Sequence, residues 1–316
     1  MIPLRVRHFW LLLAPAVLIG LVMWPRAGSI AGQSAPAVAM QWAEAQADAP
    51  ALPGQADSAL EVAPEPIAAQ AAVTATGIGL DQHDDLFAYA SSLQAAAAAG
   101  DASANWQLSR VYDYCSGYAL DPAGFAADSQ WLQQQQDPGI ATMLLARQRM
   151  AHSCGGFTAA DGLSAQQVMQ QRLLAAKAGN LAAEAALLAI GQPLQTSAEY
   201  RHGLVQRVLD ARDPEAYLAL APAMGGAASG DDALRDYVAG DQYAELAWQV
   251  AACRLGEECG AHSSLMTGYC ANGGICSQDA SQDFEKFVFD AAISRQGAAR
   301  MTQMIYTLVD GGEVKS

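Results

Sequence analysis

Six cysteines are the residues in this sequence best placed for chemistry. They are Cys115, Cys154, Cys253, Cys259, Cys270 and Cys276. Thiols can bind metal, exchange electrons or form disulfides, and an even number favours three disulfides if the chain is exported to an oxidising compartment, as its N-terminal residues predict. Cys115 and Cys154 each fall near the predicted end of a helix, so we expect these two to pair. The other four lie in a cysteine-rich segment, residues 251–278, and allow three connectivities.

A zinc site built from those four cysteines and His262 is the alternative to disulfides. In both close pairs, Cys253 with Cys259 and Cys270 with Cys276, five residues intervene, unlike the two-residue spacing of common zinc knuckles. The sequence contains no C-x-x-C, which argues against a redox-active pair. We therefore expect disulfides, and neither a metal nor a cofactor.

The remaining candidates for catalysis are isolated from one another. No pair of the five histidines has metal-ligand spacing. His83 precedes Asp84 and Asp85, but adjacent residues on a helix point in different directions, and acids there more often stabilise a helix start. The glycine-rich residues 225–230 lack a nucleophile elbow and a phosphate-loop lysine. No reaction is specified, so we expect no catalytic activity of the chain's own.

The elements that position these residues are helices. Long runs of Ala, Leu and Gln, with no alternating strand pattern, predict an all-α body. Capping-box sequences at residues 164–167 and 196–199 indicate two helix starts. Helical spacing of apolar residues between Phe284 and Leu308, with a break near residues 296–297, predicts helices that cap the C-terminal end of the body.

One pattern recurs along the predicted helices. A turn residue is followed by an Asp or Asn that caps the next helix, then by a small Ala four positions after the turn, then by a large apolar residue four positions further on. The turn and cap pairs are Gly100 with Asp101, Gly179 with Asn180, Arg212 with Asp213, and Gly240 with Asp241. The Ala lets a neighbouring helix approach closely, and the large residue fills the space beside it.

These copies resemble Sel-one-like repeats, which are related to the tetratricopeptide repeats, over residues 85–255. The resemblance implies antiparallel helical hairpins stacked as a short irregular superhelix or bundle, and a role as an adaptor that presents a concave surface to a partner. The turns are 79, 33 and 28 residues apart, whereas such repeats run to the mid-thirties. The first interval has room for one decayed repeat, since residues 140–154 have a helical pattern.

Residues 1–29 predict export from the cytoplasm. Arg5 and Arg7 precede an apolar run over residues 9–24, and basic residues before such a run direct the rest of the chain across the bacterial inner membrane. A cleaved signal peptide and an uncleaved anchor both fit. We favour the anchor because Trp10 and Trp24 would lie at the two membrane surfaces. The body is then periplasmic and tethered, or secreted if the leader is cleaved.

Two further segments divide the chain after the leader. Residues 30–77 are rich in Ala, Pro and Gln and predict a disordered linker. Residues 78–316 form the predicted helical domain. The chain has 32 acidic against 17 basic residues, a formal charge of -15, which disfavours nucleic acid and favours a protein partner with a neutral or basic surface.

These observations favour a periplasm-facing protein-interaction scaffold that reaches the inner membrane through residues 9–24. Two alternatives remain open. An envelope-acting hydrolase would need an acid pair that the sequence does not reveal. A purely structural spacer would lack any exposed concave or apolar patch.

Overall fold

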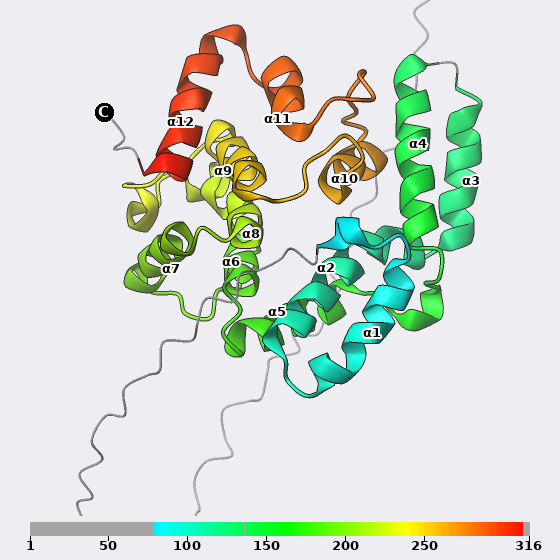
Figure 1. The fold of residues 1–316 in the computed structure, drawn as a ribbon, viewed down its shortest axis with the longest axis horizontal. Helices are drawn as coiled ribbons and strands as arrows, with labels where there is room; N and C mark the ends of the chain where they lie inside the picture. The colour runs from blue at the N-terminus through cyan, green and yellow to red at the C-terminus, as the bar shows by residue number, and fades with distance from the viewer. Residues whose placement is uncertain (1–78, 136, 312–316) are drawn as a thin grey trace, which may run out of the picture. The chain divides into compact units, whose positions relative to one another are not determined.

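The computed structural model describes residues 79–135 and 137–311, which belong to one compact unit (Figure 1). Within these ranges the chain is helical and has no strands, so the predicted all-α class is confirmed. The predicted leader at residues 1–29 and the linker at 30–77 lie outside the described residues. No helix of the described ranges combines the length and apolar composition needed to cross a bilayer.

Twelve α-helices make up the described part of the chain. In order they are α1 (Leu86–Ala98), α2 (Ala102–Ala119), α3 (Pro122–Gln133), α4 (Pro138–Ser153), α5 (Ala165–Lys177), α6 (Leu181–Ala189), α7 (Ala198–Ala211), α8 (Pro214–Met224), α9 (Gln242–Leu255), α10 (Ser264–Gly273), α11 (Phe284–Phe287) and α12 (Ala298–Asp310). Short 3-10 helices join them at Leu80–Gln82, Ala159–Asp161, Gly226–Ala228, Asp232–Leu234 and Arg295–Gly297, and a π-helical turn comes directly after α11 at Val288–Ala292.

The recurring sequence pattern marks the starts of α2, α6, α8 and α9. The turn residues Gly100 and Gly179 have φ values of 88° and 93°, a left-handed conformation that glycine adopts without steric cost. Arg212 and Gly240 are also left-handed, with φ of 52° and 101°. The next residue caps the following helix each time; Asp101, for example, accepts a hydrogen bond from the Ala104 amide at 2.7 Å. The four turns are therefore built alike.

The small and large residues of the pattern lie in the core. All eight are buried: Ala104, Ala183, Ala216 and Ala244, and Leu108, Leu187, Leu220 and Trp248. Because an alanine side chain is short, helix α8 packs closely against both α6 and α9. The large residues fill the space that remains; Trp248 contacts Tyr217 with their ring centroids 4.9 Å apart.

The 79-residue interval between the first two turns holds an inserted hairpin. Helices α3 and α4 pack against each other and run side by side in Figure 1. Helix α2 nevertheless packs directly against α5, as it would if α3 and α4 were absent. The Cys115–Cys154 disulfide joins α2 to the end of α4, and α4 also packs against α10. Between α2 and α5 the interval thus holds two further helices, α3 and α4, of which only α4 was anticipated.

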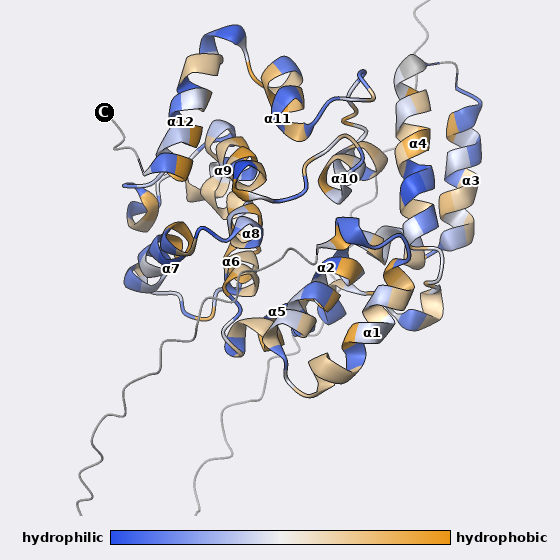
Figure 2. Cartoon of the chain, in the orientation of Figure 1, coloured by the Kyte–Doolittle hydropathy of each residue, from blue (hydrophilic) through white to orange (hydrophobic). Residues whose placement is uncertain are grey.

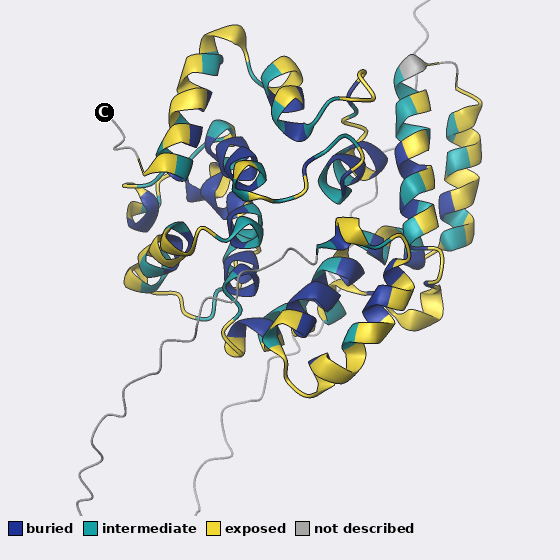
Figure 3. Cartoon of the chain, in the orientation of Figure 1, coloured by how far each residue is buried: buried dark blue, intermediate teal, exposed yellow. Residues whose placement is uncertain are grey.

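Two clusters of buried residues form the core. One extends from α5 to α12, with Trp106 of α2, and includes Trp248 and Tyr217; the other joins α1 to α4 with the start of α5 and the end of α10. Figure 2 shows hydrophobic and hydrophilic residues interspersed along most helices. In Figure 3 the buried residues concentrate in α2, α6, α8 and α9, whereas α3, α7 and α12 carry many exposed ones. These four helices, called the inner helices below, therefore supply close to half of the buried apolar residues.

The C-terminal helices α11 and α12 pack against α9 and cover it. Helix α12 begins at Ala298, directly after the predicted break, and buries Met301, Ile305 and Leu308 on one face. It packs against α9, and the Tyr217 hydroxyl donates to the Leu308 carbonyl oxygen at 3.1 Å. Without this helix, the apolar side of α9 would be open to solvent.

The two capping sequences identified helix starts to within a residue. Ser164 caps α5 as predicted and accepts from the Gln167 amide at 3.3 Å. Helix α7 is capped by Ser197, one position later than the first residue of the predicted box. The shift arises because Ser197 offers the same hydroxyl as Thr196, and its side chain reaches the Tyr200 amide at 3.1 Å.

Candidate binding groove

An open groove of about 510 Å³ lies over α2, α6 and α8. Its apolar lining is Leu80, Ala186, Ala189, Ile190, Leu218, Ala219, Pro222 and Leu265. Its polar lining is Trp106, Arg110, Asp113, Tyr114, Arg172, Glu215, Ser264 and Asn272. These residues come from α2, α5, α6, α8 and α10 and from the turn before α1. A site assembled from so many elements exists only in the folded domain.

Helical periodicity explains why one side of each helix faces the groove. On α2 the groove residues Trp106, Arg110 and Asp113 recur at helical spacing, while Leu108 between them points into the core. On α8 the groove is lined by Glu215 and by Leu218, Ala219 and Pro222, which lie three, four and seven positions after Glu215, whereas Leu220 is buried. The same helices thus serve the core with one face and the groove with another.

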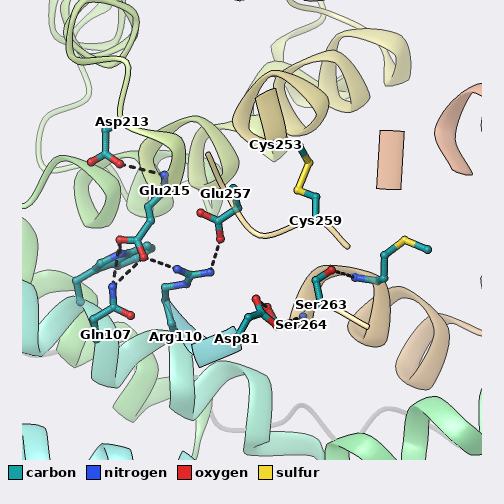
Figure 4. Close-up of polar contacts among 12 residues, drawn as sticks. Asp81, Gln107, Arg110, Asp213, Glu215, Cys253, Glu257, Cys259, Ser263 and Ser264 are labelled. Carbon is teal, nitrogen blue, oxygen red and sulfur yellow. Dashed lines mark hydrogen bonds and ion pairs between the residues drawn. A yellow bond between two sulfur atoms is a disulfide. The ribbon is translucent and has the colours of Figure 1, made fainter. Parts of the chain in front are cut away.

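Arg110 is the centre of a buried ion-pair network at the base of the groove (Figure 4). Its guanidinium donates to the carboxylates of Glu215 and, at 2.8 Å, of Glu257. The three side chains are 11%, 23% and 8% exposed. Glu215 also accepts from the indole Nε1 of Trp106 at 2.7 Å and from the amide of Gln107 at 2.8 Å. One arginine thereby connects α2, α8 and the loop after α9.

Burial raises the pKa values of titratable groups in and near this network. Burial raises the pKa of the Glu257 carboxyl, although Arg110 opposes the rise. Burial, together with the negative charge of Glu215, raises the pKa of Asp213, the residue that caps α8. Burial also raises the pKa of the Tyr114 hydroxyl to about 12, so this phenol stays protonated at neutral pH. Tyr114 can therefore only act as a neutral hydrogen-bonding group.

A second ion pair lies among the polar groups that line the groove. Arg172 of α5 donates to Asp113 of α2 at 2.6 Å. The Arg172 side chain is 14% exposed and Asp113 is 59% exposed. Of the charged groups that line the groove, the Asp113 carboxylate is therefore the one most open to solvent.

Neighbouring groups engage both acids of the groove lining. The carboxylate of Glu215 is engaged by Trp106, Gln107 and Arg110, and that of Asp113 by Arg172. A general acid or base must exchange a proton with substrate, and Glu215, which accepts from three side chains, is poorly placed for that role. Within the described residues, no group of three or more His, Cys, Asp or Glu side chains is arranged to hold a metal ion.

The cysteines form three disulfides. Cys115 pairs with Cys154 as predicted, and the four in the cysteine-rich segment pair as neighbours, Cys253 with Cys259 and Cys270 with Cys276. The described residues include no free cysteine. Because both sulfurs of each close pair are bonded to each other, these four thiols are not available to a metal.

The other residues singled out from the sequence lie outside the groove. Gly100, Asp101, Gly179, Asn180, Gly240 and Asp241 occupy the hairpin turns and none lines it. His83 stacks on Tyr89 with ring centroids 3.7 Å apart. Asp85 caps α1 by accepting from the amides of Phe87 and Ala88, which is the structural role expected for an acid there.

Sequence reasoning missed the groove itself. Arg110 is separated from Glu215 by 105 residues and from Glu257 by 147, so no local pattern connects them. One signal of the ion-pair network was present in the sequence. Arg110 is a basic residue of α2 that lies among the apolar residues that build the core. Another was Glu257 between Cys253 and Cys259, because a disulfide that closes so short a loop restricts the position of the residues inside it.

Together these features define a disulfide-bonded, all-α protein of packed helical hairpins with an open groove over its inner helices. No protein family model, curated protein or solved structure matches the chain. The resemblance to Sel-one-like repeats therefore stays a prediction from the sequence.

Proposed function

We propose that this chain is a protein-interaction scaffold without catalytic activity, and that a partner protein binds in the groove. Residues 9–24 would hold it at the inner membrane of a bacterial cell, with the helical domain in the periplasm. The observation that carries the proposal is the groove's apolar lining, where large side chains such as Ile190, 43% exposed, remain open to solvent.

The dimensions of the groove favour a segment of a partner over a whole domain. Its volume of about 510 Å³ accommodates a few side chains. Most of the apolar lining comes from α8 and from α6 with Ile190 just after it, and four of the polar groups come from α2, so an inserted segment would meet both kinds of surface. This mixture is typical of binding sites, where a few polar groups set orientation and apolar contacts supply affinity.

The disulfides support a location outside the cytoplasm. Disulfides persist in oxidising compartments, and the cytosol keeps most thiols reduced. All six cysteines of the chain are paired in the structure. This agrees with export by the leader predicted for residues 1–29.

Site-specific photo-crosslinking in living cells tests the proposal. A photoreactive amino acid replaces Ile190 or Leu218 in the groove, and in matched controls it replaces Thr302 or Gln303, which are exposed on α12. We expect a discrete adduct from the two groove positions and none from the controls. Adducts from all four positions alike, or from α12 alone, would contradict the proposal. The absence of adducts at every position would favour the structural spacer.

A further inference from the structure

We infer that the groove recognises a basic side chain, lysine or arginine, carried on a segment of the partner protein whose flanking residues are apolar. This inference rests on the proposed function and specifies the partner's chemistry. It depends on the balance of charge around the groove, on which charges are open to a ligand, and on the apolar surface beside them.

Acidic groups outnumber basic ones around the groove. Two acids, Asp113 and Glu215, and two arginines, Arg110 and Arg172, belong to the lining. Behind the lining, Glu257 shares Arg110 with Glu215. Two further acids lie close by: Asp213 accepts from the Glu215 amide, and Asp81 accepts from the hydroxyl of Ser264. The region therefore has an excess of negative charge that a cation would neutralise.

The positive groups of the groove are not available to an anion. Both terminal nitrogens of Arg110 are bonded to carboxylates, and its side chain is 11% exposed. Arg172 is 14% exposed and donates to Asp113. Asp113, by contrast, is 59% exposed and is the charge that an incoming ligand would meet. A carboxylate or phosphate would meet this negative charge before either guanidinium, so an anionic ligand is disfavoured.

The acids of the network also repel one another. The charge of Glu215 contributes to the raised pKa of Asp213 and of Glu257, after burial, which is the larger cause in both. A bound cation would offset part of this repulsion, since an opposite charge nearby stabilises the ionised carboxylate. A basic ligand would reduce the repulsion between these carboxylates, and an acidic ligand would increase it.

The apolar part of the groove fits the rest of a basic residue. Lysine and arginine carry three or four methylene groups that pack on apolar surface while the charged end stays polar. Leu218, Ala219 and Pro222 of α8 form such a surface in the same groove as Asp113. The net charge of the whole chain, -15, would also speed the approach of a basic segment.

Selection from a random peptide display library against the purified full chain in detergent tests this inference. We expect enriched peptides to share one Lys or Arg flanked by apolar residues and to block crosslinking from Leu218. A synthetic enriched peptide should lose about 10-fold or more in affinity when its basic residue is replaced by norleucine, which keeps the apolar stem and removes the charge. Raising the salt concentration should weaken binding of the basic peptide only.

Two matched variants test whether Asp113 binds the basic residue of the peptide. Asp113→Asn should weaken binding of the basic peptide by about 10-fold, whereas Glu199→Gln, which removes an exposed acid of α7 outside the groove, should not change it. Thermal unfolding of Asp113→Asn checks that the domain stays folded. Enriched peptides without a basic residue that still block the Leu218 crosslink would overturn the inference and leave the groove's function standing. If no enriched peptide blocked that crosslink, this inference would fail, whereas the absence of the crosslink itself would contradict the proposed function.

Discussion

Substitution of Arg110 by methionine would leave Glu215 and Glu257 without the cation that they share. Removing one partner of a buried ion pair costs about 3 to 5 kcal/mol, because the remaining charge stays buried and unpaired. Glu215 keeps its hydrogen bonds from Trp106 and Gln107 and is 23% exposed, so we expect the lower end of that range. A loss of about 3 kcal/mol corresponds to a fall of about 6 to 12 °C in melting temperature for a domain of this size.

The measurement is urea and thermal unfolding of the full chain in detergent, monitored by circular dichroism with the disulfides intact. Lys286→Met is the control, because its ion pair with Asp283 is on the surface, with side chains 69% and 39% exposed, and should contribute little. Combining Arg110→Met with Glu215→Gln and Glu257→Gln should recover much of the loss, since no charge is then left buried without a partner.

A loss in Arg110→Met no greater than in Lys286→Met would refute this reasoning. It would mean that solvent reaches Glu215 and Glu257 once the arginine is gone, and that the network does not join α2 to α8 and the loop after α9. A triple variant less stable than Arg110→Met would also contradict it, because the unpaired carboxylates could not then be the cause of the loss.

Three other substitutions have expected outcomes. Replacing Cys115 and Cys154 by serine should destabilise the domain by about 4 kcal/mol, because the bond closes a loop with a sequence separation of 39; unchanged urea unfolding would contradict this. Gly179→Ala should cost about 1 kcal/mol because φ is 93° there, and Gly203→Ala in α7, where φ is not positive, should cost nothing or stabilise. The pKa of Asp213 is raised above 3.8, so the folded state holds this proton more tightly than the unfolded state, and stability falls as pH rises from about 3.8 through the raised pKa. Asp213→Asn keeps the helix cap and should flatten that fall in unfolding experiments at a series of pH values; a fall as steep as in the parent chain would show that another group causes it.

The parts of the fold that sequence could predict depend on local chemistry. Asp101 caps α2 from the residue directly after the turn at Gly100, and such a pair can be recognised because its members are adjacent. The same holds for Asn180 after Gly179. The predicted break before α12 also matches, since the spacing of Met301, Ile305 and Leu308 is set by the helix itself.

Of the inserted hairpin, α4 was predicted and α3 was missed, although the sequence carries signals for both. Helices α3 and α4 begin at Pro122 and Pro138, each preceded by an aspartate that caps the helix. Proline is favoured in the first turn of a helix because its missing amide has no partner there in any case. The Asp121 and Asp137 caps would therefore have indicated two helix starts within the 79-residue interval.

The groove could not be predicted because its members are distant in sequence. Glu215 comes from α8, Arg110 from α2 and Ser264 from α10, and only packing brings them together. The pairing of the last four cysteines has a similar cause. Each bond depends on how the chain turns after a helix, where Cys253 and Cys270 lie near the ends of α9 and α10.

The sequence distances spanned by Arg110 also bear on the order in which the domain folds. Hairpins form from neighbouring residues and are quick to assemble, whereas contacts across 105 and 147 residues wait until the chain has collapsed. Interactions absent from the folding transition state act mainly on the rate of unfolding. The ion pairs of Arg110 would then slow unfolding and so set how long the folded domain persists, with little influence on the rate of folding.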